Sequence, residues 1–244
     1  MIKAYAKSDV GKIREMNQDY YYISNSLDEI QLYMLADGMG GYNGGEIASK
    51  LAIQSAKNYI ENNFRTIEKD KDSIIQLLAS SMEYANMVVY EKSKENRELE
   101  GMGTTLEIVL IYNNKAYIGH IGDSRIYRIR KSFIRKLTQD HSYVQKLVKD
   151  GQITQEQAEH HPKKNMLMKA LGCNAFVEPD VMVKGFLKDD IIVMSSDGLT
   201  NLVNQEEIYN HAKENIELAT KELVDMANER GGYDNITLVI IKNI

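Results

Sequence analysis

Four aspartates adjoin strand-like apolar segments, and each has glycine as a close neighbour: Asp37, Asp123, Asp197 and Asp234. A carboxylate at the end of a buried strand is costly unless a partner compensates its charge. The glycines, which have no side chain, allow backbone carbonyls and amides to approach such a group closely, as a hard cation or a phosphate requires. One Asp-Gly pair usually marks only a turn. Four such junctions predict that distant segments of the chain meet at a polynuclear metal site.

The length and composition are those of an ordinary globular protein. The 244 residues are 43% hydrophobic and 27% charged, and without a linker or an internal repeat they are expected to form a single domain over residues 1–244. A net charge of -5 argues against a nucleic-acid partner. Cys173 is the only cysteine, which excludes an internal disulfide. Since there is no membrane-spanning run or signal-peptide core, we expect a cytoplasmic protein with no membrane partner.

Hydrophobic periodicity predicts both strands and amphipathic helices. Strands are expected at residues 20–23, 32–35, 105–112, 116–121, 126–129, 133–137, 181–183, 191–194 and 236–241. Helices are expected at about 44–60, 74–89, 206–213 and 217–229. Asn113-Asn114 is expected to form a two-residue hairpin turn, and the run of short strands around it predicts an antiparallel meander. The polar residues 138–171 are expected to form a mobile flap beside a site.

The residue types at the junctions suit magnesium or manganese. Hard divalent cations prefer carboxylates, backbone carbonyls and water as ligands. The sequence offers this set as Asp37, the carbonyl of Gly38, Asp197 and Asp234. Two such ions roughly 3.5–4 Å apart would lower the pKa of a water held between them, and the hydroxide would attack a phosphorus in line.

Further polar residues would complete such a site. The guanidinium of Arg14 suits a phosphate, because its fork can grip two phosphate oxygens. Asp123 would hold a further, weaker ion. Asp19 and Asn235 suit positions behind the metal ligands.

Other phosphatase chemistries lack their required residues. A cysteine phosphatase needs an arginine six positions after its nucleophile, where Cys173 is followed by Pro179. An aspartyl-phosphate mechanism needs Asp-x-Asp at the end of an apolar strand, whereas Asp70-Lys71-Asp72 lies in a charged stretch. Gly122-Asp123 is not accompanied by the Asn-His motif of the histidine-using metallophosphatases. Two alternatives remain, a catalytically silent binding module and a structural scaffold, and metal-dependent release of phosphate would exclude both.

Taken in order, the motifs of the chain resemble those of one family. They are Arg14-x-x-Asn17-Gln18-Asp19, Ala36-Asp37-Gly38-Met39-Gly40-Gly41, Gly103-Thr104-Thr105, Gly122-Asp123-Ser124-Arg125, Ser196-Asp197-Gly198 and Asp234-Asn235. This set resembles the PPM family, the metal-dependent type 2C serine/threonine protein phosphatases, in a bacterial form. The resemblance covers nearly the whole chain. It implies an α+β fold, a four-layer α/β/β/α sandwich of two antiparallel sheets flanked by helices, with a Mg²⁺ or Mn²⁺ centre at one end.

The resemblance also implies roles for individual residues. Asp37 would bridge two core ions, Gly38 would be a carbonyl ligand, and Asp197 and Asp234 would complete the core set. Asp123 with Asp197 would hold a third ion.

Arg14 would bind the phosphate, and residues 138–171 match the family's variable flap. Met39 stands where many eukaryotic relatives carry a histidine proposed as general acid. Methionine cannot protonate a leaving group, so this role falls to metal-bound water or another group, or is dispensable. His120, in a strand pattern, and His141, at the start of the flap, are expected to be structural.

We therefore expect a cytoplasmic signalling enzyme that depends on Mn²⁺ or Mg²⁺. It would hydrolyse phosphoserine and phosphothreonine by in-line attack of metal-activated water, without a covalent intermediate. The expected partners are phosphorylated proteins, namely a bacterial serine/threonine kinase that the enzyme opposes and the substrates of that kinase. The chain is expected to be a monomer.

Overall fold

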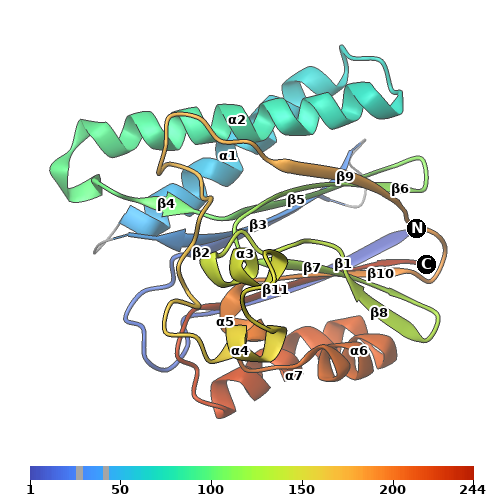
Figure 1. Ribbon diagram of the computed structural model, residues 1–244. Helices are drawn as coiled ribbons and strands as arrows, with labels where there is room; N and C mark the ends of the chain where they lie inside the picture. Colours follow the sequence, from blue (N-terminus) through green and yellow to red (C-terminus); the bar gives the residue numbers. More distant parts are fainter. Residues whose placement is uncertain (26–29, 41–43) are drawn as a thin grey trace.

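The computed structural model describes residues 1–25, 30–40 and 44–244, and its strands form two antiparallel sheets (Figure 1). In spatial order the first sheet contains β1 (Ile2–Asp9), β11 (Ile236–Asn243), β10 (Ile191–Ser195), β7 (Arg125–Arg130) and β8 (Phe133–Lys136). The second contains β2 (Asp19–Ile23), β3 (Gln31–Met39), β5 (Leu106–Tyr112), β6 (Lys115–Ile121) and β9 (Asp180–Gly185), with the short β4 (Gly103–Thr104) beside the end of β3.

Helices cover the outer face of each sheet (Figure 1). The second sheet is covered by α1 (Gly44–Phe64) and α2 (Lys71–Glu95), and the first by α6 (Gln205–Glu214) and α7 (Ile216–Glu229). Shorter helices are η1 (Arg97–Leu99), α3 (Tyr143–Lys149), α4 (Gln155–Glu159) and α5 (Asp197–Thr200). The four-layer α/β/β/α sandwich implied by the motifs is confirmed.

Polar caps, which carry no apolar signal, decide where the helices begin. Asp70 Oδ1 accepts hydrogen bonds from the backbone N–H groups of Asp72 (2.8 Å) and Ser73 (3.0 Å), so α2 starts earlier than its apolar stripe. Asn204 caps α6 in a reciprocal arrangement with Glu207, whose side chain accepts from the Asn204 backbone. Because such caps satisfy the free N–H groups of a first turn, each helix extends beyond the residues that periodicity alone indicates.

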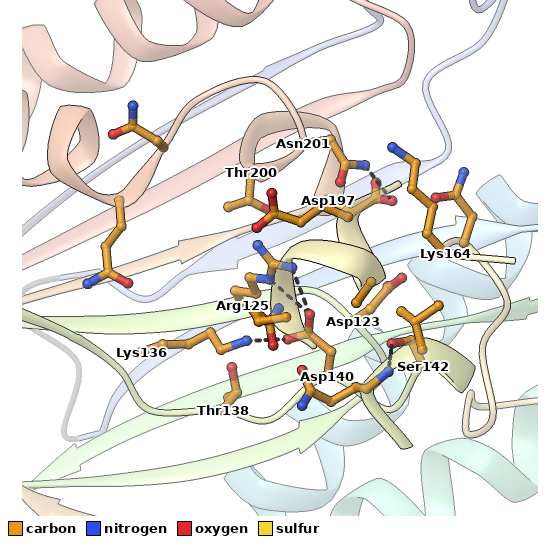
Figure 2. Close-up of a pocket in the computed structure, with 18 of the residues that line it drawn as sticks. Asp123, Arg125, Lys136, Thr138, Asp140, Ser142, Lys164, Asp197, Thr200 and Asn201 are labelled. Atoms are coloured by element: carbon orange, nitrogen blue, oxygen red, sulfur yellow. Dashed lines mark hydrogen bonds and ion pairs between the residues drawn. The ribbon is translucent and has the colours of Figure 1, made fainter. Parts of the chain in front are cut away.

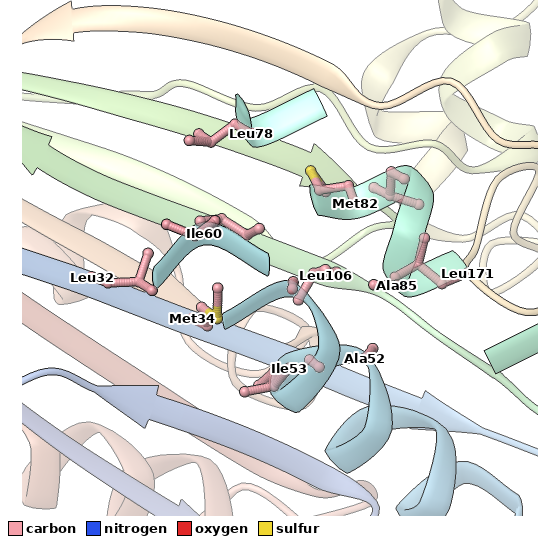
Figure 3. Close-up of a cluster of buried hydrophobic side chains, with 14 of the residues drawn as sticks. Leu32, Met34, Ala52, Ile53, Ile60, Leu78, Met82, Ala85, Leu106 and Leu171 are labelled. Atoms are coloured by element: carbon pink, nitrogen blue, oxygen red, sulfur yellow. The ribbon is translucent and has the colours of Figure 1, made fainter. Parts of the chain in front are cut away.

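Successive side chains of a strand point to opposite faces of its sheet, and this alternation creates three apolar layers. On β3, Tyr33 and Leu35 point between the two sheets, while Leu32 and Met34 point toward α1 and α2. Figure 3 shows the layer between sheet and helices, where labelled residues include Leu32, Met34, Ile53, Ile60, Leu78, Met82 and Leu106. A third layer lies between the first sheet and α6 and α7. Full burial of each large apolar side chain contributes about 1.5–3 kcal/mol.

The expected meander is wrong, because consecutive strands are shared between the sheets. The hairpin of β5 and β6 turns at Asn113 (φ 47°) and Asn114 (φ 56°), as predicted. After β6, however, the chain leaves the second sheet at Gly122 and enters the first as β7, which pairs with β10 and β8. Asp123 lies in this crossing segment.

Two further strands differ from the sequence expectation. The pattern predicts none at residues 2–9, yet β1 forms there because it pairs along its whole length with β11, from Ile2 opposite Asn243 to Asp9 opposite Ile236. As an edge strand it stays half-buried and has no clear apolar run. β3 continues past residue 35 to Met39, and Gly41 of its predicted turn lies outside the described residues.

Within the described residues, no helix has both the length and the apolar character needed to cross a lipid bilayer.

Candidate metal centre

Asp37 lies at one end of the space between the two sheets. It follows Tyr33 and Leu35 on the same face of β3, so its side chain continues the inter-sheet row beyond the apolar core. On the neighbouring strand Asp19 is directly opposite Asp37 in the antiparallel register. Two carboxylates so paired repel each other, which is costly unless a cation or a proton compensates.

The strand does not turn at Asp37, contrary to the sequence expectation. The Asp37 N–H donates to Thr105 Oγ1 (3.0 Å), and the Thr105 N–H donates to the Asp37 carbonyl (2.9 Å). Gly38 continues the pairing opposite Thr104. A Cβ at Gly38 would lie 2.1 Å from the Gly45 carbonyl oxygen and 2.5 Å from that of Gln18. Glycine is therefore required here for close approach of three backbones.

A second close approach brings Asp197 and Asp234 together. Asp197 opens α5, and Asp234 precedes β11. Between them, a Cβ at Gly198 would lie 2.0 Å from the Asn235 carbonyl oxygen, so α5 packs directly on the start of β11. Burial raises the pKa of Asp197, and the charge of Asp234 raises it further.

The electrostatics of these aspartates are those of a crowded anionic site. Burial raises the pKa of Asp37 well above its ordinary value, and the charges of Asp19, Asp197, Asp123 and Asp234 raise it further. Burial likewise raises the pKa of Asp19 to about 7 and that of Asp123 to about 8. Asp37, Asp19 and Asp123 therefore hold their protons more tightly in this site than in water, unless a cation replaces the proton.

Several of these carboxylates bond to other side chains. Asp234 Oδ2 accepts from Arg14 Nη2 at 2.8 Å, and Asp197 Oδ2 accepts from Asn201 Nδ2 at 3.2 Å. Asp19 Oδ2 accepts from Ser196 Oγ at 2.8 Å. Among the described residues, no three or more His, Cys, Asp or Glu side chains lie close enough together, as they stand, to hold a metal ion.

The donor set nevertheless fits hard divalent cations. It consists of carboxylate oxygens and the backbone carbonyl of Gly38, and such cations prefer ligands of this kind. Asp19 is only 7% exposed, and its Oδ1 has no hydrogen-bond partner among the described residues. A buried acceptor without a donor is costly. Together with the raised pKa values, it indicates that positive charge is needed at this end of the sandwich.

Arg14 is held in place by its loop, which is attached to β11. The side chain of Asn235 donates to the carbonyls of Val10 (2.9 Å) and Met16 (2.8 Å) and accepts from the Gln18 N–H (2.8 Å). Asn235 therefore fastens the segment that carries Arg14, a contact the sequence interpretation did not foresee. The Arg14 side chain remains 52% exposed, so its guanidinium is accessible from solvent.

A cavity of about 790 Å³ opens beside Asp123 and Asp197 (Figure 2). One wall is the flap, including Gln145, Gln155 and Lys164, and the other includes α5 and the residues that follow it. Its size lies in the range typical of ligand sites, roughly 300–1,000 Å³.

Most of the cationic side chains in the cavity are already paired. Arg125 and Lys136 both bond to Asp140, at 2.8 Å and 3.1 Å. Arg230 bonds to Glu207 at 2.6 Å. In the described part of the chain Lys164 has no ion-pair partner. The sequence interpretation named Arg125 only as part of a motif and missed its pairing with Asp140, because nothing in the spacing links residue 140 to residue 125.

Known proteins resemble this chain in sequence and in structure. The sequence profile of the family described as Protein phosphatase 2C matches residues 12–230. Protein phosphatase PhpP of Streptococcus pneumoniae is 37% identical over 239 residues, covering 96% of this chain and 94% of that protein. The S. agalactiae serine/threonine phosphatase has a TM-score of 0.91 at 34% identity, over 100% of both chains. The catalytic domain of the serine/threonine protein phosphatase PstP, in complex with 2 manganese ions, has a TM-score of 0.86 at 31% identity, over 99% of this chain and 97% of that one.

The raised pKa values predict how stability depends on pH without divalent cations. Asp19 and Asp123 have folded pKa values of about 7 and 8 against 3.8 in the unfolded chain. Protonation of these two carboxyls therefore stabilises the folded state. This stabilisation is complete below pH 4, near the unfolded pKa, and is lost as the pH rises through 8. In a chelating buffer we expect the free energy of unfolding, measured in urea, to fall by at least about 2 kcal/mol between pH 5 and pH 8.

The matched control is Asp123→Asn, which removes one titrating group. Its free energy of unfolding should fall less steeply over the same pH range. Added Mn²⁺ should restore stability most at pH 8. A wild-type curve parallel to that of Asp123→Asn would contradict the electrostatic account.

Proposed function

This chain belongs to the protein phosphatase 2C family and is a metal-dependent protein serine/threonine phosphatase, and from that membership we propose which of its residues carry out the reaction. Asp37, Asp197, Asp234 and the carbonyl of Gly38 hold two core ions of Mn²⁺ or Mg²⁺. Asp123, with Asp197, holds a third. When bound, the ions activate a water for direct attack on phosphorus and stabilise the negative charge that develops.

One observation supports this proposal above all. Asp19 lies directly opposite Asp37 on the neighbouring strand, and further carboxylates surround the pair. The two arginines of the site offset only part of this negative charge, since Arg14 pairs with Asp234 alone and Arg125 is engaged by Asp140. Bound divalent cations would replace the protons that these acids otherwise retain.

Arg14 is proposed to bind the phosphate of the substrate. Its guanidinium is exposed and already contacts the candidate ligand Asp234 at 2.8 Å. On substrate binding the remaining N–H groups would donate to phosphate oxygens, where charge-assisted bonds are strong. Asn235 keeps the loop of Arg14 in register with Asp234.

Attack by water without a covalent intermediate is supported by the side chains nearby. Partial burial raises the pKa of the Cys173 thiol, so little of it is present as the nucleophilic thiolate. Met39 has no proton to give to the leaving oxygen. That proton would therefore come from water or from another group of the site.

The substrates are proposed to be phosphoserine and phosphothreonine proteins, whose chain would lie in the cavity beside Asp123. Lys164 lines that cavity and is available for an acidic group of the substrate. We further propose that the chain is a single domain and a cytoplasmic monomer that opposes a serine/threonine kinase and shares its substrates.

Replacement of a core ligand should separate activity from stability. Asp37→Asn is expected to abolish Mn²⁺-dependent phosphate release from a phosphothreonine peptide, while in chelator its melting temperature equals or exceeds that of the wild type because repulsion is relieved. Asp189→Asn is the matched control, since Asp189 lies in the turn before β10, at the end of the sandwich opposite the site. Wild-type turnover by Asp37→Asn would exclude the ligand assignment.

Removal of the guanidinium should weaken phosphate binding. Arg14→Ala is expected to raise KM for the phosphopeptide about 10- to 100-fold, as loss of charged hydrogen bonds worth about 1.5–3 kcal/mol implies. Arg14→Lys should be intermediate. Arg135→Ala, which removes an exposed arginine from the edge strand β8, should leave KM unchanged. An unaltered KM in Arg14→Ala would refute the assigned role.

The third ion is tested separately by Asp123→Asn. This variant should lower kcat while still binding two Mn²⁺ ions per chain, as counted by equilibrium dialysis. Loss of the two core ions would show that Asp123 belongs to the core set.

A further inference from the structure

A row of polar side chains crosses the second sheet next to the candidate metal centre, one residue pair further into the sandwich. Glu107 on β5 lies directly opposite His120 on β6, and His120 lies opposite Asp180 on β9. The side chains of Glu107 and His120 are both 0% exposed. They occupy the inter-sheet face next to the apolar residues Val109 and Ile118.

Glu107 connects this row to the strand that carries Asp37. Its Oε1 is 2.9 Å from His120 Nδ1, and its Oε2 is 3.3 Å from Thr105 Oγ1. Thr105 Oγ1 in turn accepts from the Asp37 N–H at 3.0 Å. A continuous chain of hydrogen bonds therefore runs from the backbone of the candidate bridging ligand to the imidazole of His120.

His120 connects the row to the first residues of the flap. Its Nε2 is 2.9 Å from the carbonyl oxygen of Gln139. A carbonyl can only accept, so Nε2 carries a proton, and the second proton of the pair lies between Nδ1 and Glu107. The ring also stacks on His141, with centroids 4.6 Å apart.

His141 fastens both ends of the flap. Its N–H donates to the Gly122 carbonyl (2.7 Å), and its own carbonyl accepts from the Met168 N–H (2.8 Å). Its Nδ1 accepts from the Gly122 N–H at 3.2 Å, which requires an unprotonated nitrogen. Burial and the neighbouring charge of His120 lower the pKa of His141 to about 4, in agreement with a neutral ring.

Stability alone does not explain a buried acid and imidazole at this position. Desolvation of such a pair usually cancels most of its attraction, and well-packed apolar side chains of similar volume are often as stable. What an apolar pair could not provide is the directed bond to Gln139 and the link through Thr105 to Asp37.

We propose that Glu107 and His120 are positioning residues that anchor the flap, residues 138–171, to the strand carrying Asp37. They thereby hold the flap wall of the cavity in the position that binds a phosphoprotein. This inference rests on the proposed function for its substrate, but the anchoring itself is independent of that function.

The test is the apolar double variant Glu107→Leu/His120→Leu. Its melting temperature should stay within about 5 °C of the wild type, because packing is retained. Amide hydrogen exchange in residues 139–168 should become at least tenfold faster. The factor by which KM for a phosphothreonine protein rises should be at least five times the factor by which kcat falls.

The control removes a half-exposed ion pair far from the flap, Lys7→Leu/Asp225→Leu, which joins β1 to α7 at 2.8 Å. It should change neither flap exchange nor KM. A stable Glu107→Leu/His120→Leu variant with wild-type exchange and KM would overturn the proposal, since the pair would then be structural only.

If the double variant does not fold, Glu107→Gln tests the same point with smaller expected effects. The amide keeps the shape but not the charge, so flap exchange should still quicken about twofold or more, and unchanged exchange would overturn the anchor. If the wild type released phosphate from no substrate, the proposed function would be contradicted. The exchange measurement would still show whether Glu107 and His120 anchor the flap.

Discussion

The opposition of Asp19 and Asp37 on adjacent strands is the constraint on which the rest of the site depends. Antiparallel pairing places both carboxylates on the inter-sheet face, beyond the last apolar residues of that row. Their repulsion cannot be relieved by moving one strand, because a shift of one residue would turn every side chain of that strand to its other face. The fold thus supplies the stability that keeps like charges together, and the site needs cations or protons to compensate.

Close packing of backbones gives this anionic cluster its shape. Gly38 contacts the carbonyls of Gln18 and Gly45, and Gly198 contacts that of Asn235. At both positions any side chain would force the strand or helix away by the width of an atom. Asn235 then joins the loop of Arg14 to β11 by three hydrogen bonds. Arg14, which is proposed to bind the phosphate, and the candidate ligand Asp234 are therefore connected, although they come from opposite ends of the chain.

The start of the flap is attached to this arrangement by polar contacts, whereas at its end Leu171 packs in the apolar core. Glu107 and His120 occupy inter-sheet positions where Val or Ile would pack, and they direct hydrogen bonds to Thr105 and Gln139. Arg125 and Lys136 bond to Asp140 in the same region. Such contacts specify a direction as well as a distance, so they can fix the position of a segment that has only a small core of its own.

The sequence by itself determined the fold class, most strands and helices, the family and the four aspartate junctions, because alternation, turn chemistry and ordered motifs are local signals. It did not reveal β1, which pairs with β11 from the other end of the chain. Nor did it reveal the continuation of β3 through Asp37 and Gly38, which depends on pairing with β2 and β4. It predicted His120 to be structural but did not identify Glu107 as its partner. Only the tertiary structure decided these points, since cross-strand register and contact between distant backbones depend on the position of a second segment, which no local pattern contains.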